Sequence, residues 1–262
     1  DGTLLLSGAQ SLQEELFPLI RELKESKILF LPASGRQYPN MRRLFAPVLD
    51  DMAFICENGA MAVQNEEVLY QDRFDPALTR EIAEAIYETE GAEFSCATKD
   101  FYYIMPKTQH FLELMTEVVK TDSRVIDSFD KITEPCMKLA VYEKDGIQEE
   151  SIRYWQERFS GRCTVVTSGF AWVDFIPLGT NKARGLEVYQ KRLGILPEEC
   201  VVFGDEYNDI EMLKATPYSF AMEHAKPGVK KAASYTTKRV ETVLEELIRT
   251  KGNIEEAMKR VQ

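Results

Sequence analysis

The chain has 262 residues and a formal net charge of -11, and 44% of its residues are hydrophobic. This length suits one large domain or two smaller ones. The acidic balance disfavours nucleic acid and anionic membranes as partners, and no apolar run approaches the ~18 residues of a membrane span. The five cysteines form no CxxC pair and there are only two histidines. We therefore expect reduced cysteines, no zinc site and a cytoplasmic protein.

The first part of the chain alternates apolar strands with amphipathic helices. Apolar residues at helical spacing predict a helix over 11–25, and KILFLPAS at 27–34 predicts a buried strand. Pro39 suits the first turn of the next helix. A strand over 52–60 then ends in an Asn-Gly pair, and residues 61–72 indicate a short hairpin.

The last part of the chain repeats this alternation. A helix near 182–194 precedes a segment at 199–209 that reads as a strand running into a polar loop. A helix at 209–214, the short strand YSFAM, a helix from Pro227 and the C-terminal helix ETVLEELIRT follow. Strands alternating with helices predict an α/β fold with a mainly parallel, Rossmann-like sheet covered on both faces.

The middle of the chain has a different pattern. Helices are expected at 76–90, 108–120 and 147–159. The strand pair EFSCA and DFYYIM follows the first helix, the single strand CMKLAVYE follows the second, and the pair CTVVTS and FAWVDFIP follows the third. The last two strands are joined by Ser168-Gly169, a hairpin signal. The order αββ–α–β–α–ββ predicts a separate α/β domain with an antiparallel sheet. The predicted domains are a discontinuous core over 1–72 and 179–262 and an inserted domain over 73–178.

Four polar clusters follow apolar strands or begin helices. In parallel sheets, ligands bind at the carboxyl ends of the strands, so clusters at these positions can share one site. A single cluster is weak evidence, because a serine before a helix is usually an N-cap and a lone lysine is usually solvated. The clusters are Asp1-Gly2-Thr3, Ser34-Gly35-Arg36, Lys182, and the segment Gly204-Asp205-Glu206-Tyr207-Asn208-Asp209.

These clusters, in this order, resemble the four signature motifs of the haloacid-dehalogenase superfamily, specifically its Cof-type branch of metabolite phosphatases. The first motif of that family ends Asp-x-Asp-Gly-Thr, and Asp1 matches its second aspartate. The family's nucleophile is the first aspartate, two residues before Asp1, which is not in this sequence. We expect the native protein to carry that aspartate and a preceding strand. The middle domain resembles the large α/β cap of Cof-type members.

The resemblance implies a Mg²⁺-dependent phosphatase that hydrolyses a small phosphorylated metabolite through an aspartyl-phosphate intermediate. A divalent cation would remove the repulsion between two anions, and hard oxygen ligands suit Mg²⁺. Asp1 would also act as general acid and then general base. The implied catalytic residues are Asp1 and Lys182; the phosphate-binding residues are Ser34, Gly35, Lys182 and Asn208; the metal-binding residues are Asp1, Asp205 and Asp209; and the substrate candidates are Arg36 and Asn58.

Simpler structural roles compete with several of these assignments. Asp209 could cap the helix that follows it, and Arg36 could form a salt bridge between core and cap. Asn58-Gly59 could be a turn beside the site. His224, like the other histidine, carries no catalytic signal. The candidates in the middle domain for leaving-group contacts are Phe101, Tyr102, Tyr103, Trp172 and Asp174, although an aromatic run on strands is more often core.

Three other functions compete with the phosphatase. A mutase would transfer the phosphoryl group to another sugar position, and the large cap also occurs in phosphomannomutase-like members. A catalytically silent protein would keep the phosphate pocket for binding or regulation. A dinucleotide-binding dehydrogenase is disfavoured, because no G-x-G-x-x-G follows the first strand.

Overall fold

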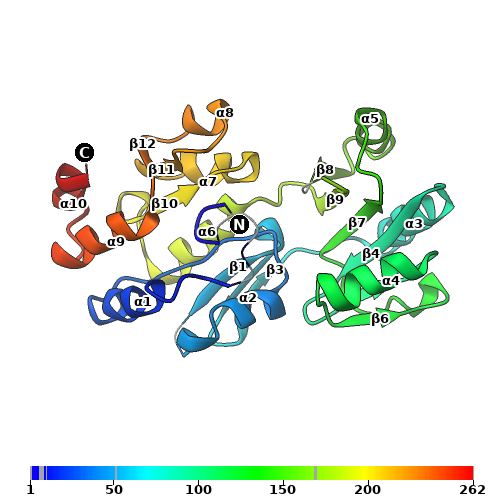
Figure 1. The fold of residues 1–262 in the computed structure, drawn as a ribbon, viewed down its shortest axis with the longest axis horizontal. Coiled ribbons are helices and arrows are strands. Elements are labelled where there is room, and N and C mark those ends of the chain that lie inside the picture. The colour runs from blue at the N-terminus through cyan, green and yellow to red at the C-terminus, as the bar shows by residue number, and fades with distance from the viewer. Residues whose placement is uncertain (1, 6–8, 10, 51, 168–169, 262) are drawn as a thin grey trace. The chain divides into compact units, whose positions relative to one another are not determined.

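The computed structural model describes residues 2–5, 9, 11–50, 52–167 and 170–261. The chain divides into two compact units. Unit 1 comprises 1–36, 41–70 and 181–262, and unit 2 comprises 37–40 and 71–180. Figure 1 shows that the blue start and the orange-red end of the chain belong to the same unit, whereas the cyan-to-green middle forms the other.

Unit 1 holds two small sheets and the helices around them. In one sheet, β10, β11 and β12 run parallel in that order, and in the other β1 pairs antiparallel with β2, beside β3. The strands are β1 (Ala53–Cys56), β2 (Met61–Gln64), β3 (Glu67–Gln71), β10 (Val201–Gly204), β11 (Tyr218–Met222) and β12 (Tyr235–Thr237). The helices are α1 (Leu16–Glu25), α6 (Lys182–Leu193), α7 (Ile210–Lys214), α8 (Pro227–Lys230), α9 (Val240–Arg249), α10 (Ile254–Val261) and the part of α2 (Tyr38–Leu44) from residue 41 on, the first residues of α2 being assigned to unit 2.

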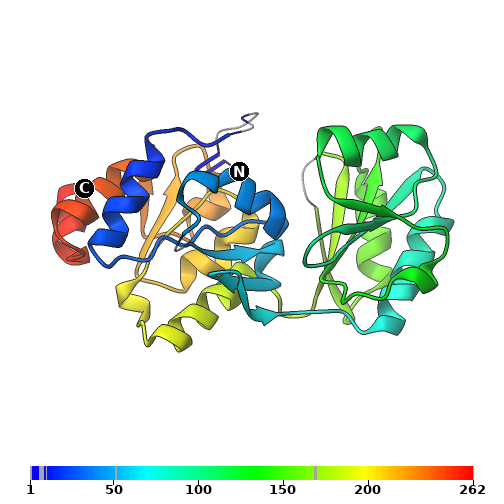
Figure 2. The same ribbon diagram turned by 90° about the horizontal axis from the view of Figure 1, so that it is seen from below.

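Helices from the two ends of the chain pack together in unit 1. α1 lies beside α9, and α9 contacts α10 (Figures 1 and 2). α1 buries Leu16, Ile20 and Leu23, which recur at helical spacing, as the sequence pattern predicts. The helix begins at Leu16, later than the predicted start at residue 11. Within the described part of the chain, no helix is long and apolar enough to cross a membrane.

The strand predicted over 27–34 is wrong. Its backbone pairs with β1 at one parallel bridge, between Ala33 and Ile55, supported by hydrogen bonds around Pro32 and Ser34. A strand needs neighbouring backbone along its whole length. Residues 28–32 instead line a cavity of about 690 Å³, which they share with β10.

Unit 2 is built on one six-stranded sheet in the order β6-β5-β4-β7-β9-β8. All neighbouring pairs are antiparallel except β5 with β6. The strands are β4 (Ala92–Ala97), β5 (Tyr102–Ile104), β6 (Ser123–Val125), β7 (Lys138–Glu143), β8 (Cys163–Thr167) and β9 (Trp172–Pro177). The helices are α3 (Pro76–Glu88), α4 (Gln109–Glu113), which continues as a π-helical turn over 114–118, and α5 (Glu149–Arg158).

The predicted order of helices and strands in the middle of the chain is confirmed, with β6 as an addition. The start of α3 follows from local chemistry, because Asp75 accepts hydrogen bonds from the N–H groups of Ala77 and Leu78, and Pro76 occupies the first turn. The predicted hairpin turn at Ser168-Gly169 lies outside the described residues. The predicted fold class, an α/β core with a parallel sheet and a second α/β domain with an antiparallel sheet, is confirmed.

Close contact between α6 and β1 gives a testable prediction at Gly185. A Cβ added to Gly185 would lie 2.6 Å from Cγ2 of Ile55, which is fully buried. Alanine would favour the helix by up to about 1 kcal/mol, but overpacking a core costs about 1–3 kcal/mol. We therefore expect Gly185→Ala to destabilise the protein in urea unfolding. The cost should largely vanish in an Ile55→Ala background, and an equal cost there would contradict this explanation.

Candidate active site

Lys182 is held at the first turn of α6. The Asn181 side chain caps this helix by accepting the N–H of Arg184 at 3.0 Å. The Lys182 side chain is buried, and its Nζ donates to Oδ1 of Asp209 at 2.6 Å. Breaking a buried ion pair leaves an uncompensated charge, so each partner stabilises the position of the other.

Asp209 also closes the polar loop that follows β10. Its Oδ2 accepts the backbone N–H groups of Asp205 at 2.9 Å and Glu206 at 3.0 Å. Asp209 therefore caps the turn before it and makes no side-chain cap to α7, the helix after it. Both of its carboxylate oxygens have protein donors, one from the loop and one from Lys182.

Asp205 presents a carboxylate of a different kind. Its Oδ1 accepts the Thr3 hydroxyl at 2.6 Å, and its Oδ2 lies 3.9 Å from Nε2 of His224. Burial raises the pKa of the Asp205 carboxyl; the nearby Asp209 adds to this, and the Thr3 hydrogen bond and His224 oppose it. A desolvated carboxylate gains strongly from a nearby cation. His224 was not singled out from the sequence, because its proximity to Asp205 arises from folding.

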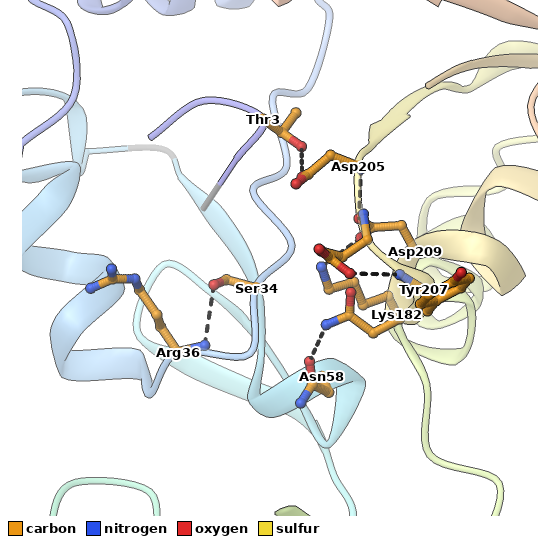
Figure 3. A network of polar contacts seen from close by, with 10 residues as sticks. Thr3, Ser34, Arg36, Asn58, Lys182, Asp205, Tyr207 and Asp209 are labelled. Atoms are coloured by element: carbon orange, nitrogen blue, oxygen red, sulfur yellow. Dashed lines mark hydrogen bonds and ion pairs between the residues drawn. The ribbon is translucent and has the colours of Figure 1, made fainter. Parts of the chain in front are cut away.

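Ser34 lies where the 28–33 segment meets β1. Its N–H donates to the carbonyl of Ile55 at 2.9 Å, and its hydroxyl oxygen accepts the N–H of Arg36 at 3.1 Å. The Ser34 side chain is buried. In Figure 3 the Arg36 side chain extends away from Lys182 and Asp205.

Asn58 lies next to these residues at the end of β1. Its Oδ1 accepts Nδ2 of Asn208 at 2.9 Å, which links it to the loop after β10. Both residues are candidates from the sequence, but their spacing gives no reason to pair them. The structure thus gathers the described candidates of unit 1 around one set of polar contacts (Figure 3). Asp1 lies outside the described residues.

Part of the lining of the 690 Å³ cavity is polar and includes several of the candidate residues. A phosphoryl group beside them would meet the ammonium of Lys182 in a chain of net negative charge. Apolar lining comes from the 28–32 segment, β10 and neighbouring helices, and further polar lining comes from Glu198, Lys251 and Glu255. The polar lining residues named by the sequence are Ser34, Arg36, Lys182, Asp205 and Asp209.

The acidic side chains present differ in how well they suit a cation. Among the described residues there is no group of three His, Cys, Asp or Glu side chains that could hold a metal. Asp205 offers a partly desolvated carboxylate with its Oδ1 held by Thr3, and this fits a hard divalent cation. Asp209 already accepts three protein donors, so its carboxylate fits direct coordination less well.

The leaving-group candidates in unit 2 mostly belong to its own cores. Phe101 and Tyr103 lie in one buried cluster, and Tyr102 and Trp172 lie in another. Asp174 is buried at 3% exposure, with Nζ of Lys138 3.5 Å from its Oδ2. The aromatic run is therefore explained by packing, whereas the Lys138–Asp174 pair places charge inside the unit.

Comparison with known proteins identifies the family. Unit 1 has an α/β fold with polar side chains after its strands and at the start of α6. Its sequence matches the haloacid dehalogenase-like hydrolase family over residues 1–244, and the chain belongs to this family. The predicted family and the prediction of an enzyme are confirmed.

Individual relatives agree with this assignment. The chain is 28% identical over 235 residues to the 5-amino-6-(5-phospho-D-ribitylamino)uracil phosphatase YbjI of Escherichia coli, covering 90% of this chain and 87% of that one. A solved structure from Eubacterium rectale matches with a TM-score of 0.83 and 24% identity, covering 99% and 96%. BT4131, a subclass IIB sugar phosphatase, matches with a TM-score of 0.75 and 24% identity, covering 99% and 95%.

Proposed function

We propose that the protein is a Mg²⁺-dependent phosphatase that hydrolyses a small phosphorylated metabolite, a sugar phosphate or a related compound. The observation that carries this proposal is the buried Lys182–Asp209 pair beside the partly desolvated Asp205. The pair offers a fixed ammonium for a phosphoryl group, and Asp205 offers a carboxylate for a cation. The names of YbjI and BT4131 support a polyol or sugar as the alcohol part.

The charge of each site residue determines whether it would bind the phosphoryl group or the cation. Lys182 would bind an equatorial phosphoryl oxygen, and the Ser34 hydroxyl with the Gly35 N–H would bind another. Asp205, with the backbone carbonyl of Asp1, would hold Mg²⁺, which would neutralise the repulsion between the nucleophile and the phosphate. Asp209 would keep Lys182 and the loop in place.

The reaction would proceed in two steps. An aspartate carboxylate, placed by the family pattern two residues before Asp1, would take the phosphoryl group while the ester oxygen leaves. Asp1 would protonate that oxygen, then remove a proton from the water that attacks the acyl phosphate. Inorganic phosphate and the free alcohol would be the products.

A phosphatase screen tests the proposal directly. The intact protein is incubated with a panel of sugar and sugar-alcohol phosphates, with Mg²⁺ or with a chelator, and released inorganic phosphate is measured. We expect release from at least one ester with Mg²⁺ and its loss with the chelator. An isomeric sugar phosphate formed without free phosphate would point to a mutase. Binding of the panel without any conversion would point to a silent binding protein.

A further inference from the structure

The turn after β1 has an unusual backbone. Glu57, Asn58 and Gly59 have φ of 48°, 56° and 100°, so three consecutive residues adopt positive φ. L-residues other than Asn and Asp rarely enter this region, because the Cβ approaches the neighbouring carbonyl. Glu57 is 0% exposed and Asn58 is 6% exposed, so the costly conformation of Glu57 is maintained at a buried position. Such strain persists where surrounding contacts fix it.

Backbone contacts of Asn58 and its neighbour hold the Ser34–Arg36 loop. The Asn58 N–H donates to the carbonyl of Ser34 at 3.0 Å, and the Glu57 N–H donates to the carbonyl of Arg36 at 3.1 Å. The backbone of the turn therefore donates hydrogen bonds to both ends of the Ser34–Arg36 loop. Between them, a Cβ on Gly35 would lie 2.9 Å from Oδ1 of Asn58, so glycine allows the loop to lie against this side chain.

The Asn58 side chain also orients Asn208. Its Oδ1 accepts one N–H of the Asn208 Nδ2 group, at 2.9 Å. A side-chain amide nitrogen carries two N–H groups. With one N–H held by Asn58, the second is fixed in direction and can donate to a phosphoryl oxygen. Asn208 itself is exposed, and an exposed amide without such a partner would rotate freely.

We propose that Asn58 is a positioning residue that fixes the Asn208 amide and the Ser34–Arg36 loop relative to each other. This role replaces the direct substrate contact suggested by the sequence. The proposal rests on the proposed phosphatase function, since it assigns the two positioned segments to the phosphoryl group. In this arrangement the Asn58 side chain contacts a residue 150 positions further along the chain, while its backbone N–H donates to the Ser34 carbonyl.

The test variant is Asn58→Gly, because glycine adopts the required φ and loses only the side chain. Asn65 is a matched control: it has φ of 49° in the exposed turn between β2 and β3. We expect Asn58→Gly to lower kcat/KM by about tenfold to a hundredfold, the range for a lost hydrogen bond to a charged group. It should also weaken the binding of inorganic phosphate in calorimetry, whereas Asn65→Gly should change neither.

A double-mutant cycle with Asn208→Ala separates positioning from structure. If Asn58 acts on the phosphoryl group partly through Asn208, the double variant should lose less activity than the product of the single losses. The proposal would be overturned if the loss of activity in the double variant equalled the product of the two single losses. It would also be overturned if Asn58→Gly bound phosphate as tightly as the wild type. Thermal unfolding of each variant shows whether a loss reflects folding.

A measurement on Asn208 in the wild-type protein keeps the proposal testable if Asn58→Gly fails to fold. In ¹⁵N-labelled protein, the Asn208 side-chain amide is identified by its loss in Asn208→Ala. We expect an NMR order parameter as high as that of ordered backbone, despite the exposure of Asn208. A freely rotating amide would contradict the inference. This readout does not require turnover, so absence of hydrolysis would count against the proposed function and leave the positioning result intact.

Discussion

Lys182→Met is expected to lower kcat/KM by about 10²–10³-fold, the loss seen when one charge-stabilising donor is removed from a reaction site. The same change should destabilise the protein by about 3–5 kcal/mol, because it leaves the buried Asp209 carboxylate without its ammonium. Urea unfolding and phosphate release measure the two effects separately. Wild-type turnover in this variant would show that Lys182 takes no part in the reaction.

Two further variants distinguish catalysis from folding at this position. Asp209→Asn in the Lys182→Met background removes the orphaned charge and keeps an oxygen for the N–H groups of Asp205 and Glu206. Stability should recover, while turnover should stay low. Lys191→Met, on the same helix, breaks an exposed pair with Glu187 and should cost no more than about 0.5 kcal/mol. Recovery of activity in the double variant would show that Lys182 acts only through stability.

Local patterns in the sequence predicted the elements that depend on local chemistry. α1, α3 and α6 carry an apolar stripe, a capping side chain, or both, and these signals lie within a few residues of each other. The polar clusters were recognisable because carboxylates, an amide and glycine crowd the end of one strand, where a cap needs a single residue. The family resemblance then supplied the order of these clusters along the chain.

Features that depend on distant partners were not predictable in the same way. KILFLPAS has the composition of a buried strand, but strand formation requires continuous backbone partners, and these residues have a single bridge to β1. β6 and β12 are three residues long and lie at sheet edges, so their burial pattern is weak. Spacing could not show that Asp209 uses both oxygens within the protein, or that Asn58 meets Asn208.

Asp205→Asn is expected to abolish Mg²⁺-dependent turnover, by about 10³-fold or more, because a bound cation supplies several kcal/mol of charge stabilisation. Asparagine keeps an oxygen for the Thr3 hydroxyl, so the local hydrogen bond can persist. Calorimetric titration with Mg²⁺ should show binding to the wild type and its loss in the variant. Unchanged Mg²⁺ affinity would refute the assignment of Asp205 as a ligand.

Stability against pH provides an independent check on Asp205 in metal-free protein. Burial raises the pKa of this carboxyl on folding, so folding favours its protonated form. The ionised group therefore costs stability at neutral pH, and that cost disappears as pH falls below the ordinary pKa of aspartate. Metal-free Asp205→Asn should be at least as stable as the wild type at pH 7, with the difference in stability closing in acid.

Glu206→Gln, which alters an exposed neighbour paired with Lys226, should show neither this pH dependence nor loss of Mg²⁺ binding. A stability loss at pH 7 in Asp205→Asn would mean that the carboxylate is stabilised by the protein itself, and the case for a cation at this position would fail.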